Sequence, residues 1–357
     1  MTEATSTARA DRLLDLLGER ELDCLLVSNL VNVRYLTGFT GTNGACVVTP
    51  DERLFVTDFR YVEQAQEQVR GFELVKGERD LLGQLAKLLS GRAGFDDAHV
   101  SVRTHGKLLE ATNEGVELVE AGGLVERLRE VKDEDELRAI VAATELADEV
   151  YELLRERGVS GRSEREVARW LEAELRERGA EPGFPVIVAS GAHGALPHAV
   201  PRDVAVESGT LMIVDMGALL DGYCSDCTRT FAIGSTDDRG REVYELVLEA
   251  QQSALGAVRA GAGYSEVDAV ARDIIEAGGF GERFGHGLGH GVGLEVHEGP
   301  RLAKTAEGEL AAGNVVTVEP GIYLPGELGV RIEDLVVVVE GGRTVLSGTT
   351  KDLVSVD

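Results

Sequence analysis

The sequence predicts a two-domain protein in which a smaller α/β domain, residues 1–127, precedes a larger α+β domain, residues 128–357. Helix and strand patterns alternate in the first part of the chain, and this rhythm is typical of an α/β domain. Beyond residue 184 strand patterns predominate and two helical patterns interrupt them, which indicates helices packed on a mainly antiparallel sheet. The length of 357 residues also exceeds what one minimal core needs.

In the first domain, the amphipathic pattern ADRLLDLLGERELD predicts a helix over residues 10–23. Short apolar runs then predict strands at CLLVS, GACVVTP and RLFVTD. The stretch YLTGFTGTNG, residues 35–44, carries glycines and an Asn-Gly pair, which predict a turn or exposed loop between strands. It lacks the Lys-Ser/Thr ending of a phosphate-binding loop.

The second domain opens with two long helices whose first turns carry capping boxes, Asp133 with Glu136 and Ser163 with Glu166. Gly179 predicts the end of the second helix. The faces expected to be buried are Leu137, Ile140, Val141, Thr144, Val150, Tyr151 and Leu154 on the first helix, and Val167, Trp170, Leu171 and Leu175 on the second. Later strands are predicted at FPVIVAS, TLMIVDMG, GYCSDCTRTFAIG, NVVTVEPGIY and GVRIEDLVVVVE, with helices over roughly 240–259 and 265–277.

The composition argues against several functions. A net charge of −27, from 36 basic and 63 acidic side chains, opposes binding to nucleic acid. No apolar run approaches the roughly 20 residues of a membrane span, so no membrane association is expected. The amino terminus lacks the pattern of a secretory signal, and a cytoplasmic location is therefore expected.

Four cysteines, Cys24, Cys46, Cys224 and Cys227, are too few for a disulfide framework in a chain of this size. The spacing in CSDC, residues 224–227, would suit a redox pair or half of a zinc site. Within a strand, however, an offset of three sends the two sulfurs to opposite faces. We therefore expect two unrelated buried thiols.

Carboxylates occur within or beside the apolar strands of the second domain. Asp215 follows LMIV directly, and Asp226 lies eleven residues further on in another predicted strand. Glu319 precedes Pro320, which favours extended backbone at residue 319. An ionised carboxylate in such surroundings needs an arginine, another cation or a metal nearby, although each alone is also compatible with an ordinary turn.

The stretch GVRIEDLVVVV adds an arginine and two more acids. Arg331 and Glu333 are two residues apart, so one face of a strand is expected to carry both, with Asp334 on the other face. A guanidinium beside Glu333 would keep that carboxylate ionised, and a solvated Arg-Glu pair is the alternative.

The stretch FGHGLGHGVGLEVHEGP, residues 284–300, sets His286, His290 and His297 among glycines. Each glycine would cost a helix about 1 kcal/mol, so loop and extended chain are predicted despite the His-x-x-x-His spacing. Glycines allow the backbone to approach a site closely, which leaves room for imidazoles to converge.

Together these residues predict a centre with two metal ions. Asp215, Asp226, Glu319 and Glu333 carry four negative charges, which two divalent ions neutralise, and His290 supplies a neutral nitrogen ligand. Oxygen-rich ligation with one imidazole and no thiolate favours Mn²⁺, with Co²⁺, Zn²⁺ and Fe²⁺ as alternatives.

These motifs resemble those of the dinuclear metallopeptidases of pita-bread fold, which include proline dipeptidases, aminopeptidases P and methionine aminopeptidases. The resemblance spans nearly the whole chain. The five metal ligands of that family correspond to Asp215 in VDMG, Asp226 in GYCSDCTRTF, His290, Glu319 in VEPGIY and Glu333 in VRIED. The leading YLTGFTGTNG and VTDFRYVEQA resemble the creatinase-type domain of Xaa-Pro peptidases, which methionine aminopeptidases usually lack.

The resemblance also implies roles for residues around the ligands. His198 in LPHAVPRD corresponds to a substrate-side histidine, and His297 to one that faces the substrate carbonyl. His286 corresponds to a further active-site histidine, and Arg331 to an arginine that braces a bridging carboxylate. His193 departs from the family, because relatives often carry asparagine there.

The implied activity is that of an aminopeptidase P-like enzyme, in which a hydroxide bridging two metal ions attacks the bond between an amino-terminal residue and a following proline. Glu319 would accept the proton of the water, while His198 and His297 would stabilise the oxyanion and orient the substrate. The expected partners are therefore proline-containing peptides or dipeptides, and the dimers of relatives imply a homodimer. Alternatives are a strict Xaa-Pro dipeptidase, a metal-independent creatinase-like hydrolase, and a non-catalytic binding module.

Overall fold

The computed structural model describes all 357 residues, which divide into two units, Met1–Arg129 and Glu130–Asp357. The first unit has α/β character and the second combines helices with antiparallel sheets, so the predicted fold class is confirmed. None of the helices combines the length and apolar character that a membrane span requires.

The amino-terminal unit is built on a six-stranded mixed sheet with the order β4-β3-β2-β1-β5-β6. Its strands are β1 (Cys24–Val27), β2 (Ala45–Val48), β3 (Arg53–Asp58), β4 (Glu73–Gly77), β5 (Arg92–Phe95) and β6 (Glu117–Glu120). Its helices are α1 (Glu3–Glu19), α2 (Leu30–Thr37), α3 (Val62–Gln68), α4 (Leu82–Leu88), α5 (Val102–Ala111) and α6 (Leu124–Glu130). The central strand β1 pairs antiparallel with β2 and parallel with β5.

One prediction for this unit is wrong in part, because residues 35–37 of the expected loop belong to helix α2. Asn29 caps this helix by accepting a hydrogen bond from the backbone N of Val31 at 2.9 Å. Gly38 ends the helix with a left-handed φ of 84°. The glycine that suggested a turn is therefore the helix C-cap, and the turn begins after it.

The carboxy-terminal unit contains four α-helices, α7 (Glu134–Arg157), α8 (Glu164–Glu177), α9 (Asp238–Ala257) and α10 (Tyr264–Ala277), and two short 3₁₀ helices, η1 (Gly191–Ala195) and η2 (Gly281–Arg283). Its strands are β7 (Glu181–Pro182), β8 (Ile187–Ser190), β9 (Thr210–Met216), β10 (Ala218–Leu220), β11 (Tyr223–Cys224), β12 (Cys227–Ile233), β13 (Gly289–Gly291), β14 (Glu298–Leu302), β15 (Val315–Val318), β16 (Gly321–Leu324), β17 (Leu328–Arg331), β18 (Asp334–Val339) and β19 (Gly342–Val345). Both predicted capping boxes are confirmed at the starts of α7 and α8.

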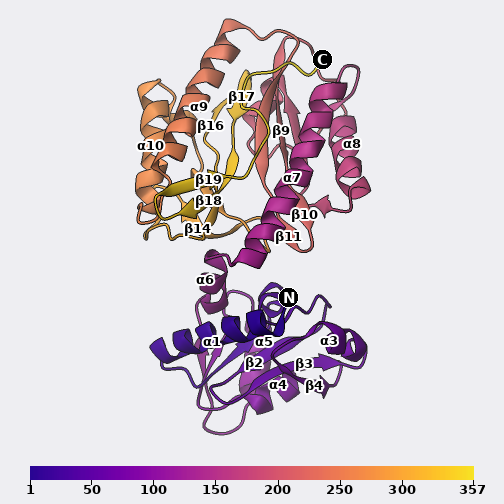
Figure 1. Cartoon of the computed structure of the whole chain (residues 1–357), viewed down its shortest axis with the longest axis vertical. Helices are drawn as coiled ribbons and strands as arrows, with labels where there is room; N and C mark the ends of the chain where they lie inside the picture. Colours follow the sequence, from indigo (N-terminus) through magenta and orange to yellow (C-terminus); the bar gives the residue numbers. More distant parts are fainter. The chain divides into compact units, whose positions relative to one another are not determined.

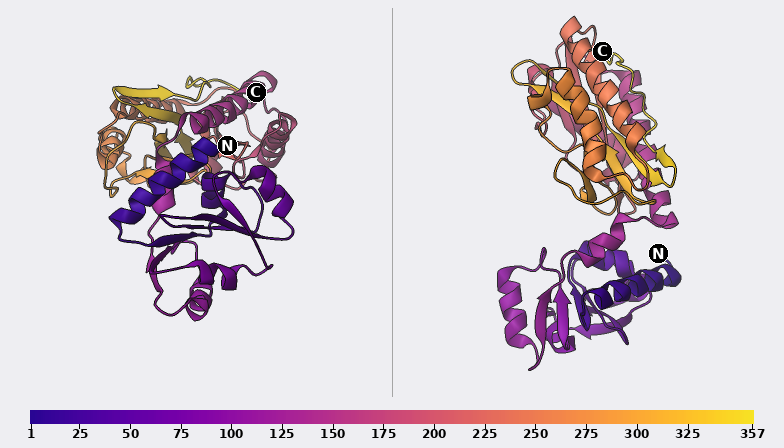
Figure 2. Two further views of the ribbon diagram at one scale, coloured as in Figure 1. Left: turned by 60° about the horizontal axis from the view of Figure 1, so that its bottom comes forward. Right: turned by 90° about the vertical axis from the view of Figure 1, so that its left-hand side faces the viewer.

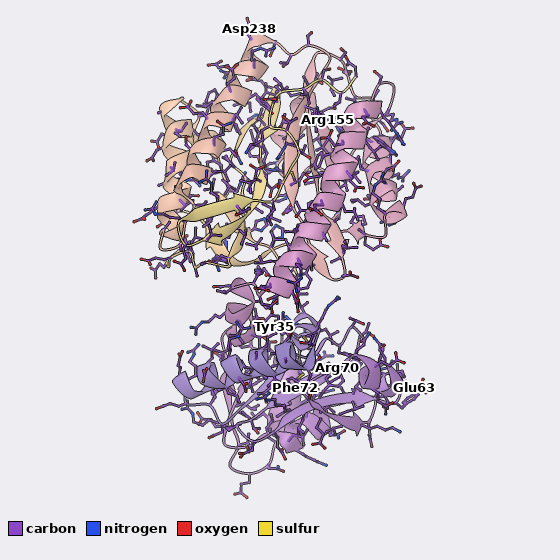
Figure 3. All side chains as sticks on the ribbon, viewed as in Figure 1. Tyr35, Glu63, Arg70, Phe72, Arg155 and Asp238 are labelled. Carbon is purple, nitrogen blue, oxygen red and sulfur yellow. The ribbon has the colours of Figure 1, made fainter.

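The helices of this unit form two pairs, each with its own core. Apolar side chains of α7 and α8 pack on the sheet β12-β9-β8. Those of α9 and α10 pack on strands of the sheet β14-β13-β15-β18-β19 and of the hairpin β16-β17. Helices α9 and α10 run side by side in Figure 1 and in the right-hand view of Figure 2. Side chains fill the space between the ribbons of this unit, including below α9, whose start is marked by Asp238 (Figure 3).

Three of the predicted strands of this unit are interrupted. Residues 225–226 separate β11 from β12, residues 319–320 separate β15 from β16, and residues 332–333 separate β17 from β18. An unbroken strand sends successive side chains to opposite faces, and a break allows a side chain to turn elsewhere. Each break contains one carboxylate that the sequence predicts as a metal ligand.

Candidate metal centre

The five predicted ligands converge in the carboxy-terminal unit. Asp215 lies near the end of β9, His290 lies in β13, and Asp226, Glu319 and Glu333 lie in the three strand breaks. One carboxylate oxygen each from Asp215, Asp226 and Glu333 lies within 4.8 Å of the others. His290 Nε2 is 3.2 Å from Glu319 Oε1 and 3.7 Å from Asp226 Oδ2, so the imidazole joins this group.

The carboxylates are buried and two of their oxygens lack hydrogen-bond partners. Asp215, Asp226 and Glu333 are 8%, 5% and 2% exposed. Asp215 Oδ1 and Glu333 Oε1 are buried and accept no hydrogen bond. A buried ionised oxygen without a donor or a cation is costly, so these atoms fit a metal-binding role. The donor set of carboxylates and one imidazole suits hard and borderline divalent ions.

The pKa shifts show which charges the protein compensates by itself. Burial raises the pKa of Asp226 and of Glu333 well above their usual values, and neighbouring carboxylates add to both shifts. Burial also opposes the charged forms of His290 and Glu319, but their hydrogen bond and the surrounding charges together outweigh it, raising the pKa of His290 to about 9 and lowering that of Glu319 to about 2. The imidazole thus balances Glu319, whereas Asp226 and Glu333 need a further cation to stay ionised.

Arg331 contacts a different carboxylate from the one predicted. It is the last residue of β17, so the rule that residues two apart share a strand face does not apply to Glu333. Arg331 Nη2 donates to Asp215 Oδ2 at 2.7 Å, and Nε donates to Thr228 Oγ1 at 2.9 Å. Thr228 Oγ1 in turn donates to Glu333 Oε2 at 2.7 Å. The guanidinium therefore braces Asp215 directly and Glu333 through a threonine.

A tyrosine connects the same arginine to His286. Arg331 Nη1 donates to Tyr323 Oη at 2.9 Å, and Tyr323 Oη lies 3.0 Å from His286 Nε2. His286 Nδ1 lies 2.8 Å from the carbonyl oxygen of Gly287, which assigns the ring proton to Nδ1 and makes Nε2 the acceptor. Burial lowers the pKa of His286, in agreement with a neutral ring.

The ligands form the floor of a cleft with a volume of about 790 Å³. His198, His286 and His297 line it, and the ring centroids of His290 and His297 are 4.3 Å apart. Burial, followed by the charge of His290, lowers the pKa of His297. The other lining side chains include the apolar residues Phe184, Pro185, Val186, Ile187, Pro197, Ala199, Val200, Pro201 and Val296 and the cation Arg301. The cleft thus combines a polar floor with apolar walls.

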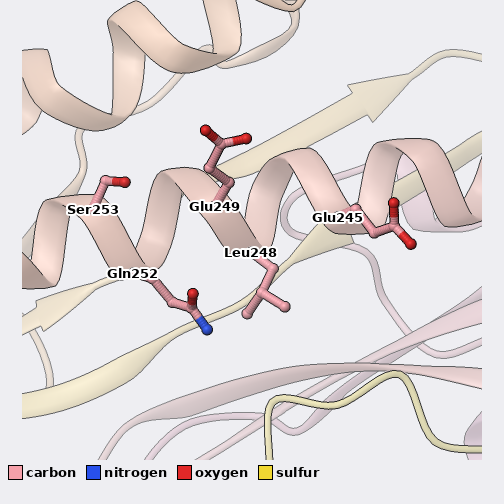
Figure 4. Close-up of a pocket in the computed structure, with 5 residues that line it drawn as sticks. All are labelled: Glu245, Leu248, Glu249, Gln252 and Ser253. Atoms are coloured by element: carbon pink, nitrogen blue, oxygen red, sulfur yellow. The ribbon is translucent and has the colours of Figure 1, made fainter.

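A second hollow, with a volume of about 360 Å³, lies along helix α9 away from the ligands. Its lining consists of Glu245, Leu248, Glu249, Gln252 and Ser253, all on that one helix (Figure 4). Its two carboxylates, Glu245 and Glu249, are exposed, and neither a third ligand nor an unpartnered buried group accompanies them. The hollow therefore provides no basis for catalysis.

The two thiols of CSDC are free and buried, and they lie in different cores. Cys224 packs with Ile140 and Val292, whereas Cys227 packs with the α7 and α8 side chains. The strand predicted to hold both is broken between them, but the expectation of two unrelated thiols agrees with their separate cores.

Three residues near the ligands are absent from the sequence predictions. Thr228 lies opposite Asp215 in the β9–β12 register, a pairing that sequence alone does not provide. Tyr323 follows VEPGI closely and Arg301 follows the last histidine motif, but neither residue type is distinctive by itself. Their positions depend on which strands meet.

A buried set of carboxylates and one imidazole at the floor of a cleft, with unpartnered oxygens, defines a metal-dependent hydrolase. Residues 138–340 match the metallopeptidase family M24, and residues 9–131 match the creatinase/prolidase N-terminal domain. The chain belongs to metallopeptidase family M24, and the resemblance found in the sequence is confirmed.

Individual relatives match over nearly their whole length. An Xaa-Pro dipeptidase from Pyrococcus furiosus is 36% identical over 97% of this chain and 99% of its own. The structure of an Xaa-Pro dipeptidase from Bacillus anthracis matches with a TM-score of 0.93 and 39% identity over 98% of this chain and 99% of that one. An X-Pro aminopeptidase from Thermotoga maritima matches with a TM-score of 0.88 and 35% identity over 97% of this chain and 99% of that one.

Proposed function

We propose that this metallopeptidase is an aminopeptidase P-like enzyme that hydrolyses the bond between an amino-terminal residue and a following proline. The observation that carries the proposal is the convergence of five ligand residues at the floor of a cleft, with two buried carboxylate oxygens unpartnered. The preference for proline is inferred from the names of the relatives.

Asp215, Asp226, His290, Glu319 and Glu333 would hold two divalent ions, for which we propose Mn²⁺ on the basis of the oxygen-rich donor set. When bound, the ions supply Lewis acidity and a water of lowered pKa. Arg331 and Thr228 hold the carboxylates of Asp215 and Glu333 in place through their hydrogen bonds. This support fixes the ligand geometry before substrate arrives.

One ligand, Glu319, and two histidines that line the cleft would act on the water and the peptide. Glu319, whose carboxylate lies beside His290, would accept the proton released from water. His297 and His198 line the cleft and would donate hydrogen bonds to the oxygen on which negative charge develops. The apolar side chains of the cleft walls would hold the proline ring and exclude water.

The length of the substrate separates two candidate activities. A cleft of about 790 Å³ lies in the range that encloses ligands of several hundred daltons, which favours peptides longer than a dipeptide and hence the aminopeptidase. Arg301 favours the alternative, a strict Xaa-Pro dipeptidase, because a cation in the cleft can pair with the carboxylate of a dipeptide. Two of the relatives above carry the dipeptidase name.

The test is hydrolysis of Ala-Pro and of Ala-Pro-Ala by chelator-treated protein with and without Mn²⁺. Metal-dependent cleavage of the tripeptide supports the aminopeptidase, and cleavage of the dipeptide alone supports the dipeptidase. No cleavage of either peptide by folded, metal-loaded protein would overturn the Xaa-Pro assignment.

A further inference from the structure

Glu164, in the first turn of α8, is a buried carboxylate outside the metal centre. Its side chain is 0% exposed. It accepts six hydrogen bonds of 2.9–3.1 Å, from the backbone N and Oγ of Ser190, Nδ1 of His193, and the backbone N, Nε and Nη2 of Arg202. All six donors are atoms of Ser190, His193 and Arg202, which lie in one stretch of chain.

That stretch, residues 190–202, contributes residues 197–201 to one wall of the cleft, and we call it the wall segment. Ser190 ends β8, His193 lies in η1, and Arg202 directly follows Pro201, so Glu164 binds the wall segment at both ends and at a third point close to its start. Between these anchors residues 197–201, including His198, line the cleft. Val200 is 78% exposed and His198 is exposed as well, so burial alone does not hold this part of the segment in place.

The wall segment is also tied to the metal centre. Arg331 Nη1 donates to the carbonyl oxygen of Pro197 at 3.2 Å. Gly194 lies so close to Gly329 of β17 that a Cβ on Gly329 would lie 1.8 Å from the carbonyl oxygen of Gly194. The segment therefore spans from Glu164 on one side to the arginine that braces Asp215 on the other.

We propose that Glu164 is a positioning residue that fixes the wall segment, and with it His198, relative to the metal centre. Glu164 acts through Ser190, His193 and Arg202 without touching substrate. The inference rests on the proposed function for its catalytic consequence only. It also gives a role to His193, whose ring supplies one of the six donors.

The first test compares Glu164→Gln with Glu174→Gln. Glu174 lies on the same helix and accepts hydrogen bonds from Trp170, Arg157 and Arg178, but none from the wall segment. A displacement of about 1 Å in a catalytic group can cost on the order of 10²-fold in rate. We expect Glu164→Gln to lower kcat/KM for Ala-Pro-Ala roughly 10- to 100-fold, and Glu174→Gln to lower it less than about twofold.

A double-mutant cycle separates positioning from a general loss of structure. If Glu164 acts by placing His198, the double variant of Glu164→Gln and His198→Ala loses no more activity than His198→Ala alone. Multiplicative losses in the double variant would overturn the inference. Metal content, measured on each variant, should stay at the wild-type value.

A second readout does not depend on activity. Amide hydrogen exchange of residues 191–202 should accelerate in Glu164→Gln and stay at the wild-type rate in Glu174→Gln. Unchanged exchange in Glu164→Gln would overturn the inference. A wild-type protein without peptidase activity would instead overturn the proposed function, and hydrogen exchange would still test whether Glu164 fixes the wall segment. If Glu164→Gln does not fold, Arg202→Gln replaces it, because that side chain is 44% exposed and its loss leaves the carboxylate with Ser190, His193 and the backbone N–H of residue 202.

Discussion

Arg331 Nη2 donates to Asp215 Oδ2 at 2.7 Å, and the other nitrogens of the same guanidinium donate to Thr228, Tyr323 and the carbonyl of Pro197. A lysine has one ammonium group and cannot reach in these directions at once. We therefore expect Arg331→Lys to weaken Mn²⁺ binding by about 10- to 100-fold, as losses of outer hydrogen bonds to metal ligands do. Calorimetric titration measures this, and Arg155→Lys, at a half-buried position of α7 where the side chain pairs with Glu152 (Figure 3), is the control. Equal affinities of the Arg331 variant and the wild type would contradict the bracing role.

The carboxylate cluster should cost stability without metal and increase stability with it. The pKa of Asp226 is raised by burial and by its acidic neighbours, so this group lowers the stability of the metal-free protein as pH rises above the usual carboxyl pKa. At pH 7 the metal-free Asp226→Asn variant should therefore melt above the metal-free wild type, by roughly 2–4 °C per kcal/mol in a domain of this size.

Saturating metal should reverse that order. A ligand at about 100 times its Kd adds about 2.7 kcal/mol to the wild type, and the variant that lacks one ligand gains less. Thermal unfolding with chelator and with Mn²⁺ measures which protein has the higher melting temperature in each condition, with Asp238→Asn as an exposed control. If Asp226→Asn gains as much from Mn²⁺ as the wild type does, Asp226 is not a ligand.

His297 should matter for the chemical step and not for metal binding. Its ring lies in the cleft beside His290 but is not among the ligand group. Loss of one hydrogen-bond donor to an oxyanion costs about 10²–10³ in kcat. We expect a loss of this size in His297→Ala, with metal content unchanged in elemental analysis. His99→Ala, in the amino-terminal unit, should retain full kcat, and a large loss of metal from His297→Ala would assign that histidine to the centre instead.

Arg301 provides the test between the two peptidase activities. If it receives the carboxylate of a dipeptide, Arg301→Ala should raise KM for Ala-Pro by about 10-fold or more, since charge-assisted hydrogen bonds of this kind contribute about 1.5–3 kcal/mol. KM for Ala-Pro-Ala amide, which has no such carboxylate near the proline, should change little. Parallel changes for both substrates would mean that Arg301 acts on the cleft as a whole.

The sequence predicted the elements better than it predicted their contacts. The capping boxes at Asp133 and Ser163 and the order of helices and strands follow from local patterns, and the structure confirms them. The hydrogen-bond partner of Arg331 does not follow from local patterns, because it depends on where β17 ends and on which strand lies opposite. Local spacing identifies residues with chemical potential, and only the pairing of distant strands decides which of them meet.

The surroundings of Glu164 also could not be predicted from local sequence patterns. In the sequence it is one of several charges in a solvated-looking helix, and its burial results from a segment that lies 26–38 residues further along the chain. The homodimer implied by the resemblance and the cytoplasmic location stay predictions for the same reason, since each depends on surroundings outside this chain.

Glu164 also predicts how the protein responds to acid. Burial would raise its pKa, but hydrogen bonds from Arg202 and Ser190 outweigh burial and lower it from 4.5 to about 2. A depressed carboxyl pKa contributes stability that is complete above the unfolded value and is lost as pH falls through the folded value. The difference corresponds to about 3 kcal/mol, lost between about pH 4.5 and pH 2.

In the Glu164→Gln variant that part of the acid loss should be missing. Urea unfolding of chelator-treated protein at several pH values measures it, with fluorescence of Trp170, the single tryptophan, as a probe on the same helix. We expect the free energy of unfolding to fall by about 3 kcal/mol less in the variant than in the wild type over this window. Glu177→Gln, at the exposed end of α8, controls for the substitution itself. Parallel curves for Glu164→Gln and the wild type would mean that the six hydrogen bonds do not hold an ionised carboxylate in solution.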